Sequence, residues 1–162
     1  MLRSAAWMQY VSGKWLARAG ATSSVSILCL FLILFAVSLH AQVAVDSTTS
    51  NSATLAGAGS PTLTIAHTTA GTNRLMLVGV SINITNSSAT TVTGVTWNAT
   101  PLSLVGAHND AGLTRRVEIW SLLAPATGAG TVTVTVNIPS AVNEGVVAGV
   151  TTFTGVDQTV PL

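Results

Sequence analysis

Three residues at alternate positions near the middle of the chain have side chains that could bind a ligand. Arg116, Glu118 and Trp120 are separated by single apolar residues, so an extended strand places all three on one face. An indole can stack on a sugar ring, and a guanidinium and a carboxylate can hydrogen-bond to the sugar hydroxyls. We favour the alternative in which the charged side chains form a cross-strand salt bridge beside a tryptophan packed at the rim of a sheet. Trp97 joins this ligand face only if its strand pairs with that of Trp120.

The carboxylates are the next candidates for catalytic side chains. Glu118 and Glu144 are the only glutamates of the chain, and a glycosidase needs two carboxylates flanking the scissile bond. Their positions favour two separate surface residues over such a pair. No serine lies in a G-x-S-x-G elbow, and no lysine follows the glycine-rich stretch at residues 56–60. The sequence therefore predicts no catalytic residue, no enzyme activity and no cofactor.

Two aspartates are candidates for a calcium site. Asp110 ends a polar His-Asn-Asp stretch, and Asp157 lies in a second segment rich in turn residues. Calcium takes six or more oxygen ligands, so further groups would have to join them. A turn closed by the aspartate side chain explains each position without a metal, and we prefer that interpretation.

A change in composition near Ala41 divides the chain. Residues 25–39 (VSILCLFLILFAVSL) are apolar, the region before them is basic, and small residues follow. This order is that of a secretory signal, whose apolar core has about 7–15 residues. Residues 21–39 also come close to the roughly 20 that a membrane-spanning helix needs. Residues 1–41 are therefore a signal peptide or an uncleaved membrane anchor, and in both cases the rest of the chain is exported.

The exported part, residues 42–162, is predicted to form one domain, since about 120 residues suffice for one hydrophobic core and not for two. The single cysteine, Cys29, lies in the apolar run, so the exported part has no disulfide and no thiolate metal site. This part has three arginines, five carboxylates and no lysine, which argues against a nucleic-acid partner.

Alternating apolar and polar residues dominate the exported part. In residues 131–138 the valines fall on one face and the threonines on the other, which is typical of an antiparallel strand with one solvated face. Residues 74–82 are apolar on both faces and predict a central strand covered on both sides. Residues 92–97 and 102–105 are expected to form a hairpin. Residues 46–60 have no clear assignment, apart from a possible edge strand with a loose loop.

Two further strands are expected at residues 117–123 and 146–153, and a short one at 62–66, with turn residues between them. The pattern predicts an all-β fold, an antiparallel β-sandwich that is Ig-like or jelly-roll-like. The 146–153 strand reads as an interior strand followed by a loop that ends at Leu162. We therefore expect a module that is truncated at its C-terminus, or one whose sheet is completed by a partner strand.

Several segments carry a resemblance to a known type of module. They are Thr72–Leu75, Val92–Trp97, Arg116–Trp120 (RVEIW), Thr131–Val136 (TVTVTV) and Phe153–Thr159 (FTGVDQT). They resemble successive blocks of a repeat-prone β-sandwich module found in secreted and surface proteins of bacteria, whose function is unassigned. The resemblance covers about residues 46–162 and implies a β-sandwich without catalytic residues. It also implies a copy that is incomplete at its C-terminus.

Together these features predict an exported, non-catalytic β-sandwich module with a structural or adhesive role at the cell surface or in a secreted protein. Polysaccharide or neighbouring surface domains are the expected partners, and membrane contact is expected only through residues 21–39. One alternative is a carbohydrate-binding module that uses the Trp120 face. Another is a membrane-tethered fragment of a longer surface protein without independent function.

Overall fold

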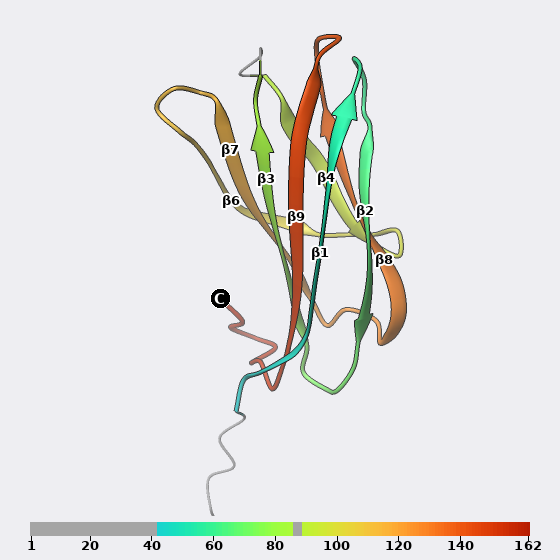
Figure 1. Cartoon of the computed structure of the whole chain (residues 1–162). Coiled ribbons are helices and arrows are strands. Elements are labelled where there is room, and N and C mark those ends of the chain that lie inside the picture. Colours follow the sequence, from blue (N-terminus) through green and yellow to red (C-terminus); the bar gives the residue numbers. More distant parts are fainter. Residues whose placement is uncertain (1–41, 86–88) are drawn as a thin grey trace, which may run out of the picture. The chain divides into compact units, whose positions relative to one another are not determined.

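The computed structural model describes residues 42–85 and 89–162, and the predicted signal or anchor at residues 1–41 lies outside these ranges. Every regular element in the described residues is a β-strand (Figure 1). The strands are β1 (Ala44–Ala56), β2 (Thr62–Thr69), β3 (Leu75–Asn83), β4 (Thr91–Trp97), β5 (Thr100–Pro101), β6 (Ser103–Asn109), β7 (Arg115–Leu123), β8 (Gly128–Asn137) and β9 (Asn143–Thr154). The prediction of an all-β fold is confirmed for this part of the chain.

The strands form two antiparallel sheets packed face to face (Figure 1). The larger sheet has the order β1-β9-β3-β7-β6, and the smaller has the order β2-β8-β4-β5. The pairs are nested: β1 pairs with β9, β2 with β8, β3 with β7, and β4 with β5. The chain therefore behaves like a long antiparallel hairpin that is folded over on itself.

The core lies between the two sheets and follows the alternation of the sequence. The apolar side chains of residues 132, 134, 136 and 138 are all fully buried, as the pattern at 131–138 predicts. Met76, Val78 and Ile82 of β3 pack against them from the larger sheet. Burial of such side chains stabilises the fold by about 1.5–3 kcal/mol each, and β-branched residues suit the pleated surface.

Two predicted features differ from the structure. Strand β3 is central, but its outer face is covered only near its start, since Gly79 and Ser81 are exposed on that face. The predicted hairpin of residues 92–97 with residues 102–105 is wrong, because the hairpin partner of β4 is the two-residue strand of Thr100 and Pro101. The chain then crosses to the larger sheet, where β6 pairs with β7. Gly79 and Ser81 could have indicated the uncovered outer face of β3 in the sequence, because a strand covered on both faces would carry larger apolar residues at these positions.

Residues 46–60, which the sequence left without a clear assignment, mostly form the long edge strand β1. This strand pairs with β9 along nearly its whole length, and β9 is therefore an interior strand, as predicted. Strand β6 forms the opposite edge of the larger sheet (Figure 1). Almost all of its residues are exposed. The larger sheet has one strand more than the smaller, and its edge strand β6 is left without cover.

Candidate functional site

The first candidate group, on strand β7, faces the interior of the sandwich. The Arg116 Nε donates to Glu118 Oε1 at 2.5 Å, and the Trp120 Nε1 donates to Glu118 Oε2 at 2.9 Å. The backbone N–H of Val92, at the start of β4 in the other sheet, also donates to Glu118 Oε1 at 3.3 Å. The carboxylate thus joins three donors and connects the two sheets.

The alternation of Arg116, Glu118 and Trp120 onto one face is confirmed, with Val117 and Ile119 on the other. The Glu118 side chain is 1% exposed and Trp120 is 9% exposed. A stacking platform needs a solvent-accessible ring face, and a residue this buried does not present one. The geometry favours the alternative of a salt bridge beside a packed tryptophan, although the bridge lies within β7 and not across strands.

The structure does not bring Trp97 to this group. Trp97 ends β4 in the smaller sheet, so its strand does not pair with that of Trp120, and its side chain is 1% exposed. Its Nε1 donates to the carbonyl oxygen of Ala126 at 3.3 Å. Its ring meets the imidazole of His67 edge-on, with the ring centres 6.0 Å apart. Trp97 is a core residue, and the predicted ligand face does not include it.

His67 lies on β2 and is held between the two sheets. Its Nδ1 is 2.8 Å from the hydroxyl of Thr49 on β1, and its Nε2 is 2.6 Å from the hydroxyl of Thr152 on β9. Both threonines belong to the larger sheet. Burial lowers the pKa of the imidazole below its ordinary value of 6.5, and the carboxylate of Asp46 opposes this effect. The sequence placed His67 at a strand end and gave no sign of this bridge.

We expect this bridge to make the stability of the protein depend on pH. The native pKa of His67 lies below that of the unfolded chain, so between the two values the unfolded state binds more protons. The free energy of unfolding should therefore be constant above pH about 6.5 and fall below it, by at most about 1.4 kcal/mol per pH unit. Urea unfolding of the purified protein at several pH values from 8 to 5 measures this slope.

The matched variant is His67→Gln, because a glutamine can still hydrogen-bond to the hydroxyls of Thr49 and Thr152 but does not titrate. It should flatten the slope between pH 7 and 5. The wild-type protein and the variant then differ only in the side chain at position 67. An equally steep slope in the variant would show that His67 is not the group responsible.

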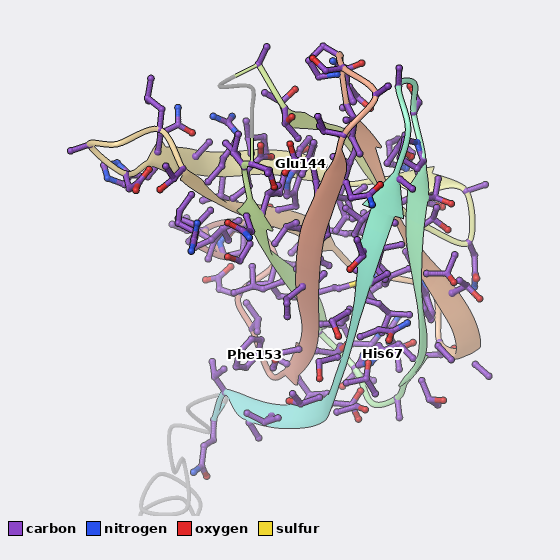
Figure 2. The ribbon with its side chains drawn as sticks, turned by 45° about the horizontal axis from the view of Figure 1, so that its top comes forward. His67, Glu144 and Phe153 are labelled. Carbon is purple, nitrogen blue, oxygen red and sulfur yellow. The ribbon has the colours of Figure 1, made fainter. Side chains whose placement is uncertain are left out.

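Glu144 is a second buried carboxylate, at the start of β9. Its side chain is fully buried and accepts hydrogen bonds from the backbone N–H of Thr85 at 2.8 Å and from the hydroxyl of Thr90 at 3.4 Å. These two residues lie near the two ends of the β3–β4 connection, so the carboxylate ties both ends to the larger sheet. Figure 2 shows Glu144 and His67 toward opposite ends of the sandwich, with Phe153 near the end of β9.

The two glutamates are separate, as expected, but the prediction that they lie on the surface is wrong, because both are buried. Strand β3 lies between their strands, and Val80 of β3 pairs with Glu118 on one side and with Ala148 on the other. Glu144 precedes Ala148 on β9 and lies beside the β3–β4 connection. Both carboxylates point inward, where the described hydrogen bonds engage them, so a sugar chain has no path between them.

The two calcium candidates each bond within their own turn. Asp110 accepts from the backbone N–H groups of Thr114 and Arg115 at 2.7 and 2.9 Å, and these bonds lower the pKa of its carboxyl. Asp157 accepts from the hydroxyl and N–H of Thr159 at 2.6 and 2.7 Å, which lowers its pKa in the same way. They lie near opposite ends of the larger sheet, and no metal-binding group of three His, Cys, Asp or Glu occurs among residues 42–85 and 89–162.

The sequence did not indicate a groove on the outer face of the larger sheet. It has a volume of about 510 Å³ and runs across β1, β9, β3 and β7. Its lining includes Ser52, Thr54, Ser81, Asn83, Arg115 and Val147. These residues occupy two adjacent rows of the sheet, because Thr54, Gly145, Asn83 and Arg115 pair in turn across it, as do Ser52, Val147 and Ser81.

Arg115 is the charged side chain of this groove, and its guanidinium is held in place from one side. Its Nη1 donates to Oδ1 of Asn83 and to the carbonyl oxygen of Thr114, the latter at 2.9 Å. Asn83 and Arg115 are direct partners on β3 and β7, so the register of the sheet places the two side chains together. The other guanidinium N–H groups have no hydrogen bond among the described contacts, and the residue is exposed.

Comparison of the chain with family models, with curated proteins and with solved structures finds no match. The resemblance to a secreted bacterial module thus stays a prediction. Among the described residues, no helix is long and apolar enough to cross a membrane.

Proposed function

We propose that the chain is an exported, non-catalytic β-sandwich module with a structural or adhesive role at the cell surface or in a secreted protein. One observation carries the proposal: the buried side chains best suited to acid–base chemistry, Glu118, Glu144 and His67, are all engaged in hydrogen bonds that join strands or sheets. A general acid or base must reach a proton on a substrate, and these groups are buried. They contribute to a rigid scaffold instead.

The strand pairing favours a jelly-roll-like sandwich over an Ig-like one. A rolled-up hairpin produces nested pairs, first strand with last and second with second last, and this is the pairing of β1–β9, β2–β8 and β3–β7. In an Ig-like sandwich the first strand pairs instead with the second, because the two sheets have the orders A-B-E-D and C-F-G. Because a jelly roll hosts unrelated functions, the fold alone does not select one.

The outer surface of the larger sheet supports the adhesive role. On this surface, threonines and serines of β1 lie beside glycines and valines of β9. Arg115 is the charged residue of the groove. Such a hydroxyl-rich, flat surface can make many weak contacts, which suits attachment through repeated units. Carbohydrate binding is the second candidate, and the open groove favours it more than the buried Trp120 face does.

Export can be tested with the full chain carrying an epitope tag after Leu162 in a bacterial host. Protease added to intact cells should remove the tag, and N-terminal sequencing of the product should begin near Gln42 if the signal is cleaved or at the start of the chain if it is retained. A tag that is protected in intact cells and digested only after lysis would overturn the proposal. A chain whose basic residues 3, 14 and 18 are replaced by glutamate is the control, since it should not be exported in this orientation.

A further inference from the structure

We propose that the groove beside Arg115 binds an acidic polysaccharide, with the carboxylate of a uronic-acid unit on the guanidinium. This inference rests on the proposed function and names the ligand class for that adhesive surface. The groove lies on the outer face of the larger sheet, away from the buried network around Glu118.

The shape of the groove suits a chain-like ligand. It lies across four strands of the larger sheet, on the outer face of that sheet. Gly145 in its floor has an ordinary backbone conformation, and a Cβ there would meet only the Cβ of Asn83, at 3.6 Å. Gly79 and Gly149, paired on β3 and β9 beside the groove, have still more free space above them. Packing does not require these glycines, and their absent side chains keep the surface low enough for a sugar chain to approach the backbone.

The charge of the groove selects an acidic ligand. A carboxylate forms its strongest hydrogen bonds with a guanidinium, which offers two parallel N–H groups. Asn83 and Thr114 hold Nη1 of Arg115, so the remaining N–H groups are orientated toward a ligand with less loss of side-chain freedom. The carboxylate of Asp110 is engaged by the turn N–H groups of Arg115 and Thr114 and makes no hydrogen bond to the guanidinium among the described contacts, although the charge of Arg115 contributes to lowering its pKa.

The other lining residues match the rest of a sugar unit. The hydroxyls of Ser52, Thr54 and Ser81 can donate to and accept from sugar hydroxyls, as hydroxyl groups do both. Val147, which is 53% exposed, offers an apolar surface to the C–H face of a ring. No aromatic residue lines the groove in the described part of the chain, so each sugar contact is weak and affinity must come from several units of a polymer.

The test compares polygalacturonate with its fully methyl-esterified form, which has the same backbone without the charge. The purified exported full-chain product is run through gels containing each polymer, and its retardation gives the affinity. We expect retardation by polygalacturonate, with little by the ester. Arg115→Gln should weaken the affinity by about tenfold, because a charge-assisted hydrogen bond is lost. Arg74 precedes β3, at the end opposite to Asn83, and donates to the carbonyl oxygens of Gly71 and Pro125. Arg74→Gln removes the same charge far from the groove and should leave the affinity nearly unchanged.

Three results would overturn the inference. Equal retardation by the charged and esterified polymers would show that the carboxylate is not recognised, and equal losses in Arg115→Gln and Arg74→Gln would show attraction to net charge alone. No retardation by polygalacturonate would exclude this ligand class. Thermal unfolding of each variant checks that the fold persists. Surface exposure of the tagged chain on intact cells tests the proposed function separately. A chain that is exposed on cells but does not bind the polymer would overturn this inference without contradicting the proposed exported module.

Discussion

Replacing Glu118 by alanine is expected to lower the free energy of unfolding by about 3–5 kcal/mol, as measured by urea denaturation of the purified protein. The change removes a carboxylate that accepts hydrogen bonds from Arg116, Trp120 and the backbone N–H of Val92. The indole N–H and the Val92 N–H would then be buried without an acceptor, and each such donor costs about 1–3 kcal/mol. The guanidinium of Arg116, whose side chain is 19% exposed, would lose its carboxylate partner and keep the hydrogen bond to Oδ1 of Asn109.

The companion variants are Arg116→Ala alone and Arg116→Ala combined with Glu118→Ala. Because the two residues are in direct contact, their effects should not add, and the double variant should be less damaged than the sum of the single variants. Asp157→Ala removes an exposed carboxylate that bonds only within its own turn among the described contacts, so it should cost less than about 1 kcal/mol. A loss of that small size for Glu118→Ala would contradict the role assigned to this carboxylate.

The alternation on β7 predicted which residues share a face and could not predict which face is buried. In β7 the apolar Val117 and Ile119 are about half exposed, while Glu118 is buried. Side-chain polarity alone favours the reverse arrangement. The inward arrangement is possible because the hydrogen-bond partners of Glu118 include an N–H from a different strand, Val92. That partner lies 26 positions away in the chain, and its approach depends on how the two sheets pack.

The segments with strong alternation of apolar and polar residues were predicted correctly, whereas β1 was not. The difference is whether the strand is determined by its own side chains or by a distant partner strand. The valines at residues 132–136 have one environment and a single register that buries them. Strand β1 carries serines, threonines and asparagine, whose composition is that of a loop, and it is a strand because β9 supplies backbone partners along its length. Pairing between residues about 100 positions apart cannot be read from local composition.

The sequence did not predict the groove beside Arg115, because the groove depends on the pairing register of four strands. Its residues come from four strands, and each looks like an ordinary surface position in the sequence. Asn83 and Arg115 are brought together by the pairing of β3 with β7, and Thr54 and Gly145 by that of β1 with β9. The glycines inside predicted strands were the available signal, because glycine weakens a strand by roughly 0.5–1 kcal/mol relative to alanine and therefore needs a reason.

Replacing Trp97 by alanine is expected to lower the free energy of unfolding by about 3–5 kcal/mol, as large-to-small changes of buried aromatic residues do. The side chain is 1% exposed and is the largest of those that are fully buried in the described residues. Its ring packs under Gly130 of β8, where an added Cβ would collide with it, and meets the imidazole of His67 edge-on. The truncation would leave a cavity between the sheets and loosen the His67 bridge.

Trp97→Phe separates the packing of the ring from its hydrogen bond. Phenylalanine keeps much of the aromatic volume but cannot donate to the carbonyl oxygen of Ala126, which Nε1 of Trp97 reaches at 3.3 Å. This variant should lose about 1–2 kcal/mol, and urea unfolding of both proteins in parallel measures the difference. Similar losses of unfolding free energy in the two variants would mean that the hydrogen bond contributes more than the packing of the ring. A loss below about 1 kcal/mol for Trp97→Ala would contradict the conclusion that this ring stabilises the packing of the two sheets. A loss for alanine that clearly exceeds that for phenylalanine would show that the cohesion of the two sheets at this end depends mainly on the buried ring, which is 1% exposed and contacts the imidazole of His67.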